Sequence, residues 1–138
     1  MAIKSRFQVS MGEIFPHGAY VVSEVEPVRD FDKSTAARPV QATDKESGLL
    51  VWAVSVLDPD PAARKDAKTV TVKISATHQP VPPEAPAGMP FRPVEFDGLT
   101  VTPYVNENGG RARIAYSLRA TGMRAPHIGA RPGKQDAA

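Results

Sequence analysis

Cationic side chains and one tyrosine are the residues whose types and spacing give this sequence a chemistry, and that chemistry is binding. Lys73 and Tyr104 lie in segments whose alternating Val, Ile and Leu residues face the other way, as do Arg111, Arg113 and Arg119 in a later segment. Proteins that bind single strands combine cations that follow the phosphates with aromatic rings that stack bases. The spacing therefore predicts a cationic sheet face suited to single-stranded nucleic acid.

Three further residues extend this predicted face. Lys68 and Arg124 flank the same segments, and Trp52, the only tryptophan, is a second potential stacking ring. Both faces of the segment around Trp52 are apolar, so a core position is the alternative interpretation. Tyr116 has the parity of its apolar neighbours, which predicts burial. The predicted nucleic-acid-binding residues are Trp52, Lys68, Lys73, Tyr104, Arg111, Arg113, Arg119 and Arg124.

The sequence does not assemble groups for catalysis or for metal binding. Its three histidines, His17, His78 and His127, stand far apart, and no pair has the spacing of a zinc site. The acids of residues 58–66 are interrupted by two cations and have the spacing of turn and capping residues rather than of a calcium loop. Cysteine is absent. We therefore expect no enzymatic activity, no metal and no cofactor.

Charge is distributed unevenly along the chain. The formal net charge is +2, yet from residue 111 onward six basic residues face one acid, whereas residues 1–60 carry six basic and nine acidic residues. A basic C-terminal third favours an acidic partner such as nucleic acid, and a solvated tail is the alternative. No apolar run approaches the roughly 20 residues of a membrane span, and the N-terminus lacks the apolar core of a signal peptide. We expect a cytoplasmic protein with no membrane partner.

Apolar periodicity predicts an all-β fold. The densest apolar stretch, Gly48–Ala76, contains two strands separated by prolines, and Asn106–Gly110 is a hairpin turn. Six prolines in residues 77–93 exclude regular pairing there, and residues 30–47 have the polar composition of a long mobile loop. Strands are predicted over residues 18–28, 49–57, 68–76, 94–105 with a bend at Gly98, and 111–120, with under about a fifth of the chain helical.

These strands match a small five-stranded OB-type barrel with long loops, and a small open β-sandwich is the alternative. One domain is expected over residues 1–126, with its core in residues 15–120, and a flexible tail over residues 127–138. Periodicity is already lost from Thr121, which predicts disorder from there on. Alternation predicts that the core contains Val22, Val54, Val70, Val72, Ile74, Leu99, Val101, Ile114 and Leu118.

Three long segments carry a resemblance to a known family. They are FPHGAYVVSEVEPVRDFDKS (residues 15–34), GLLVWAVSVLDPDPAARKDAKTVTVKI (48–74) and PFRPVEFDGLTVTPYVNENGGRARIAYSLRATGMRAP (90–126). Together they resemble the replication, integration and excision activator proteins of actinomycete integrating conjugative plasmids. The resemblance covers most of the chain and implies a small accessory protein of mobile-element DNA metabolism, without assigning site residues.

Two functions from different classes follow. In the first, a non-catalytic accessory protein binds single-stranded DNA during replication or excision through the cationic sheet face. In the second, the protein is a protein-binding adaptor or transcriptional activator whose partner is the replication initiator or an excision protein. The feature that separates them is the sheet face itself, because base stacking requires exposed aromatic rings among the cations.

Overall fold

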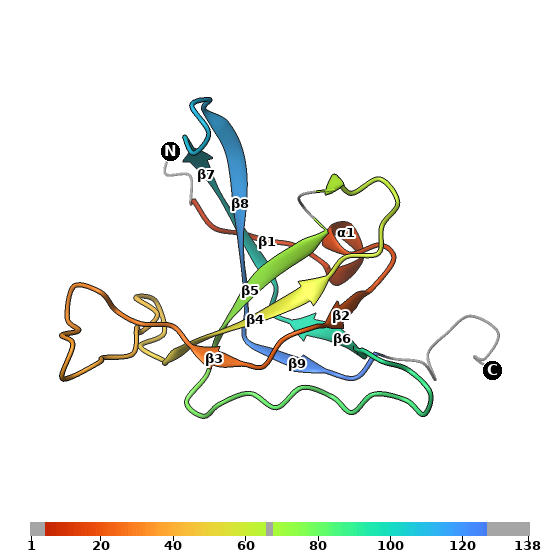
Figure 1. The fold of residues 1–138 in the computed structure, drawn as a ribbon, viewed down its shortest axis with the longest axis horizontal. Coiled ribbons are helices and arrows are strands. Elements are labelled where there is room, and N and C mark those ends of the chain that lie inside the picture. The colour runs from red at the N-terminus through yellow and green to blue at the C-terminus, as the bar shows by residue number, and fades with distance from the viewer. Residues whose placement is uncertain (1–4, 66–67, 127–138) are drawn as a thin grey trace.

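The protein folds almost entirely into β-strands, and the predicted all-β class is confirmed (Figure 1). The computed structural model describes residues 5–65 and 68–126. Within these ranges the single helix is α1, Met11–Ile14, which has four residues. The strands are β1 (Phe7–Gln8), β2 (Ala19–Val21), β3 (Glu26–Pro27), β4 (Val51–Leu57), β5 (Thr69–Ser75), β6 (Arg92–Asp97), β7 (Thr100–Asn106), β8 (Arg113–Ala120) and β9 (Gly122–Arg124).

Two of the five predicted strands are interrupted. The segment predicted as 18–28 forms β2 and β3, which pair with β4 in different registers because Val22–Val25 bulge between them. The segment predicted as 94–105 forms β6 and β7, which meet at the expected bend, Gly98. Gly98 has φ +60°, and a Cβ atom there would lie 2.5 Å from the Thr121 hydroxyl oxygen, so only glycine fits this bend.

The bend belongs to one long hairpin. Glu95 is paired with Arg124, and Thr100 is paired with Arg119, so β6–β9 and β7–β8 continue each other in a single register. The Thr121 N–H donates to the Asp97 carbonyl at 2.8 Å across the bend. The prediction that disorder begins at Thr121 is therefore wrong for residues 122–124, and the predicted flexible tail, 127–138, lies outside the described residues.

Strand pairing produces a strongly curled, open sheet. In chain order, β2 is antiparallel to β4, β4 is antiparallel to β5, β5 is parallel to β8, and β6 returns to pair with β2. This is the pairing order of the predicted OB-type barrel. The parallel β5–β8 contact is only three residue pairs long, which leaves a half-barrel and agrees with the openness of the alternative fold.

The interior of the half-barrel is apolar. Of the predicted core, Val54, Val72, Ile74, Leu99 and Leu118 are buried, and Val70 and Val101 pack against them while partly exposed. The Trp52 ring packs at the margin of this core. The remaining buried apolar residues are Phe15, Ala19, Val21, Val25, Val51, Val56, Val94, Phe96 and Ala120.

Three residues predicted to be buried are exposed. The exposed fractions of Ile114 and Tyr116 are 68% and 63%, and that of Val22, in the β2 bulge, is 37%. Ile114 and Tyr116 have the parity of Leu118, but β8 pairs with β5 only from Leu118 onward. Before that point the β7–β8 hairpin rises away from the barrel (Figure 1), so no described element covers its inner face.

The segment predicted as a long mobile loop is held by hydrogen bonds instead. The Asp30 N–H donates to the Val40 carbonyl at 2.8 Å, and the Ala42 N–H donates to the Val28 carbonyl at 2.7 Å. Two β-bridges, Arg29 with Gln41 and Thr43 with Leu50, close the segment further. The polar composition correctly predicted a surface loop. It did not indicate that hydrogen bonds join this loop to the residues next to β3 and β4.

Leu118 and Ile114, which share one parity on β8, give a direct test of this fold. Leu118→Ala should lower the free energy of unfolding by about 2–5 kcal/mol, because it leaves a cavity in the core. Ile114→Ala should change it by no more than about 0.5 kcal/mol, because the side chain is exposed. Urea denaturation of both variants measures the difference, and equal losses would contradict the open arrangement of the hairpin.

Candidate nucleic-acid interface

A groove of about 850 Å³ lies where β5 and β8 diverge. The two strands are parallel partners over Val72–Ile74 and Leu118–Ala120 and separate toward their N-terminal ends. Residues from β5, β7 and β8, from the N-terminal segment and from the β4–β5 connection line the opening. Five of the lining residues are cationic, namely Arg6, Arg64, Lys73, Arg113 and Arg119, and none of those that the structure describes there is acidic. The lining is therefore cationic, although Arg6 and Arg119 are paired with carboxylates outside it.

Four of the predicted site residues come together in this groove. Lys73 of β5 is the cross-strand partner of Arg119, and both belong to the outer face of the sheet. Tyr104 is paired with Ala115, and Asn106 is paired with Arg113, so Tyr104 and Arg113 share that outer face. Period-two alternation had placed Lys73, Tyr104, Arg113 and Arg119 on one side, and the registers bring them to one opening.

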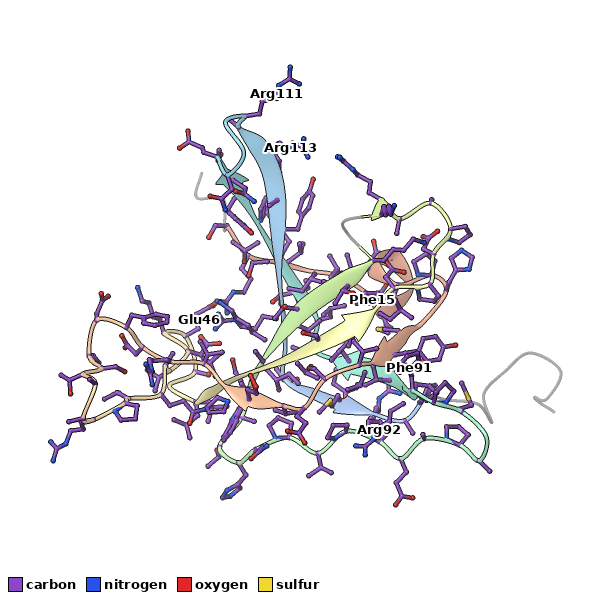
Figure 2. The ribbon with its side chains drawn as sticks, viewed as in Figure 1. Phe15, Glu46, Phe91, Arg92, Arg111 and Arg113 are labelled. Carbon is purple, nitrogen blue, oxygen red and sulfur yellow. The ribbon has the colours of Figure 1, made fainter. Side chains whose placement is uncertain are left out.

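The other four predicted site residues lie outside the groove lining. Trp52 is half-buried, and its indole N–H donates to the Ala76 carbonyl at 3.0 Å, so its ring does not stand free for stacking. Lys68 is half-buried just before β5, where its carbonyl accepts from the Asp58 N–H. Arg111 is exposed at the tip of the hairpin (Figure 2), which places it beyond the groove rather than within it.

Arg124 is committed to an ion-pair cluster on β9. Its Nε atom donates to Asp97 at 2.7 Å, and its Nη1 atom donates to Glu95. Hydrogen bonds to Asp97 and then to Glu95 raise the pKa of Arg124. These contacts link β9 to two carboxylates of β6, away from the groove. Arg124 is therefore paired within the sheet and does not line the groove.

Arg119 is also held by a carboxylate, and this carboxylate is buried. Asp44, 4% exposed, accepts from the Ser75 hydroxyl at 2.7 Å, and the Arg119 guanidinium lies 3.2 Å from the same oxygen. Arg6 lies 3.6 Å from that oxygen and also pairs with Glu46. We call Asp44, Ser75, Arg119 and Arg6 the Asp44 clasp. The clasp joins residues 29–50, the surface loop between β3 and β4, to β5, β8 and the N-terminal segment. We call this loop the 29–50 excursion.

The clasp keeps Asp44 ionised. Burial by itself would raise the pKa of this carboxyl, but hydrogen bonds from Ser75 and from the Glu46 N–H, together with the Arg119 guanidinium, outweigh it and hold the pKa well below its usual range. Arg119 is consequently a positioning residue at the base of the groove. Arg119 is thus a partly buried, ion-paired member of the predicted cationic face.

Lys73 and Arg113 differ from Arg119 in this respect. Across residues 5–65 and 68–126 no carboxylate lies within ion-pair distance of either side chain. Lys73 is half-buried beside the groove, and Arg113 is exposed at the start of β8. They are the two predicted cations that line the groove and have no internal counter-charge among the described residues.

The groove also contains residues that sequence reasoning missed. Tyr116 and Ile114 line it, although their parity had predicted burial, and so do Arg6 and Arg64 from connecting segments. One feature of the sequence concerns the same hairpin. Pro103, the cross-strand partner of Tyr116, has no amide hydrogen for a strand ladder, and within sheets proline is found mostly on unpaired edges. It marks the outer edge of β7 as unpaired, but it does not show where the β5–β8 pairing ends, which is what exposes Ile114 and Tyr116.

Comparisons with protein-family models, with curated proteins and with solved structures find no match. The resemblance to plasmid replication, integration and excision activators therefore stays a prediction from the sequence. Among the described residues, no helix has the length and apolarity needed to cross a membrane.

Asp44→Asn tests the clasp. At pH 7 it should lower the free energy of unfolding by about 2–4 kcal/mol, because breaking a buried ion pair costs about 3–5 kcal/mol and Arg119 keeps part of its hydration. A depressed pKa stabilises the fold above the unfolded value near 3.9, and this contribution is lost as pH falls below it. Wild type should therefore lose more stability than the variant between pH 6 and about pH 3.

The matched control is Asp32→Asn, which removes the same charge from an exposed position in the same excursion. It should change the free energy of unfolding by no more than about 0.5 kcal/mol. Urea denaturation at several pH values gives both comparisons. Identical acid sensitivity in wild type and Asp44→Asn would show that the clasp does not depend on an ionised Asp44.

Proposed function

We propose that this protein is a non-catalytic accessory factor that binds single-stranded DNA in the groove between β5 and β8. The observation that carries the proposal is the lining, in which Lys73 and Arg113, two cations with no carboxylate partner among the described residues, occur beside Tyr104 and Tyr116. Cationic side chains bind the phosphates of a single strand, and aromatic rings stack on the flat faces of its unpaired bases. A ligand with both properties fits this groove better than a small metabolite does.

Lys73 and Arg113 are assigned the phosphate contacts. Both line the groove, and neither has a carboxylate partner in the described part of the chain. Binding a phosphate releases condensed counterions, so affinity should fall as salt rises. Arg119 is not assigned a phosphate contact, because its charge is compensated by Asp44 at 3.2 Å.

The strand order also supports this assignment. Oligonucleotide-binding barrels of the OB type use the face of strands two and three together with the loops that follow strands one and four. In this chain those elements correspond to β4, β5, the 29–50 excursion and the tip of the β7–β8 hairpin. The groove extends this surface onto β8, which diverges from β5.

The biological setting is proposed from the family resemblance alone. It is the replication and excision of a plasmid or other integrating mobile element, in the cytoplasm. The replication initiator or an excision protein would then act on the same DNA.

A protein-binding adaptor is the second candidate, and one observation favours it. Thr69–Thr71 of β5 pair with β4 alone, and Arg113–Ser117 of β8 pair with β7 alone among the described strands. Two open strand edges can accept an extended peptide by β-augmentation. Such a peptide would have to be acidic to match the groove.

Fluorescence anisotropy with a labelled oligodeoxythymidine, at a series of salt concentrations, tests the proposed function. Arg113→Ala and Lys73→Ala should each weaken binding and reduce the log–log salt slope by about 0.7. Tyr104→Ala should remove a stacking contribution of about 1–3 kcal/mol that persists at high salt. Arg119→Ala is not informative here, because it also breaks the clasp.

Arg92→Ala is the matched control for Arg113→Ala. Both arginines are exposed strand residues, and Arg92 lies on β6, on the opposite side of the molecule from Arg113 (Figure 2). It should leave the affinity and the salt slope close to wild type. Absence of saturable binding by wild type at low salt, or equal effects of the two arginine variants, would contradict the proposal and favour the adaptor.

A further inference from the structure

The β7–β8 hairpin carries an apolar surface that the proposed phosphate contacts do not use. Pro103 is paired with Tyr116, and Val105 is paired with Ile114, so these four residues share the inner face of the hairpin. We call the β7–β8 hairpin the arm, and these four residues the arm wall. The exposed fractions of Val105, Ile114 and Tyr116 are 66%, 68% and 63%. Contiguous exposed apolar side chains on an ordered element usually mark a binding surface.

The arm wall is continuous with the groove. Tyr116 and Ile114 line the groove together with Val70 of β5. Toward the barrel, the same face continues into Leu118, which is 6% exposed. The cations Lys73 and Arg113 line the same opening from the outer face. One ligand in the groove would therefore meet apolar surface on one side and positive charge on the other.

Strand addition along β7 does not explain the exposure of the wall. Beyond Val101, β7 has no described partner on its outer edge, because β1 pairs only with Thr100 and Val101. Pro103 lies in this open part of the edge and has no amide hydrogen to donate, a common protection against edge-to-edge pairing. On the β7 side, an occupant of the wall is therefore recognised by side chains, through an apolar face.

We infer that the arm wall makes the groove select unpaired nucleotides over duplex DNA, with Tyr116 as a base-stacking residue. This inference rests on the proposed function. The faces of unpaired bases are free to stack on Tyr116 and to lie against Ile114, whereas the bases of a duplex are already stacked on one another. A duplex can therefore use only the cations, whose contacts are with phosphates and are independent of strand pairing.

Tyr104 complements Tyr116 in this arrangement. Tyr104 and Ala115 are partners on the outer face, and the adjacent pair, Pro103 and Tyr116, is on the inner face. The two rings thus project from opposite faces of neighbouring positions in the hairpin. A single strand that follows the groove around β8 meets both rings, and each adds affinity that does not depend on salt.

The test compares two probes on the full chain, a single-stranded oligodeoxythymidine and a blunt duplex of matched phosphate number. Tyr116→Ala and Ile114→Ser should weaken binding of the single strand, by about tenfold for Tyr116→Ala, without changing the salt slope. Neither should change duplex affinity, so the single-strand preference should fall by the same factor. Tyr116→Phe should bind as wild type does, because the ring is retained.

Phe91→Ala is the matched control, since it removes a 42% exposed aromatic ring just before β6, outside the groove lining. It should leave both affinities unchanged. Salt-dependent binding that Arg113→Ala weakens but Tyr116→Ala does not would overturn this inference and leave the proposed function standing. No binding of either probe by wild type would overturn both.

Sedimentation velocity of the same proteins tests whether a second copy of the chain, rather than a nucleic acid, covers the arm wall. The inference predicts that wild type and Tyr116→Ala have the same sedimentation coefficient without DNA. A wild-type dimer that Tyr116→Ala converts to monomer would mean that a second copy covers the wall, and it would overturn the inference.

Discussion

The short parallel contact between β5 and β8 is the constraint on which the rest of the molecule depends. Only Val72–Ile74 and Leu118–Ala120 are paired, at the point where the bent hairpin meets the first three strands of the barrel. A longer ladder would close the barrel and cover the inner face of β8. Because the contact ends at Leu118, the interior is sealed on one side of it, and on the other side the strands diverge into a groove with two open edges. The proposed binding surface and the hydrophobic core are thus at two ends of the same pair of strands.

The Asp44 clasp reinforces this contact at its outer face. Ser75 follows the paired segment of β5, and Arg119 lies within the paired segment of β8, so one buried carboxylate holds both strands and the 29–50 excursion together. The same interaction determines which cations are available to a ligand. Arg119 compensates Asp44, whereas its cross-strand partner Lys73, and Arg113 at the start of β8, have no carboxylate partner among the described residues. The stabilising contact and the proposed phosphate contacts therefore belong to neighbouring cations of the same groove.

Local pattern was sufficient to predict the long strands β4, β5, β7 and β8, the bend at Gly98 and the parity of the site residues, because alternation and turn chemistry are local properties. It did not predict β9, which depends on pairing with β6. It was not sufficient for Ile114 and Tyr116. Their parity is that of Leu118, and burial depends on where β5 stops covering β8, which no local pattern contains. Asp44 was likewise hidden in a polar segment, and its partners are 31 residues or more away along the chain in Ser75 and Arg119. Long-range pairing of this kind decides which cations are structural.

The most direct test of the account is an NMR titration of the ¹⁵N-labelled protein with a short oligodeoxythymidine. The account predicts saturable amide shift changes at Lys73, at Tyr104 and along Arg113–Ser117, with little change at Arg92, which lies on the far side of the molecule (Figure 2). Changes that map to β6 and the proline segment instead, or a spectrum that does not respond to excess oligonucleotide at low salt, would contradict the assignment of the β5–β8 groove as a single-strand binding site.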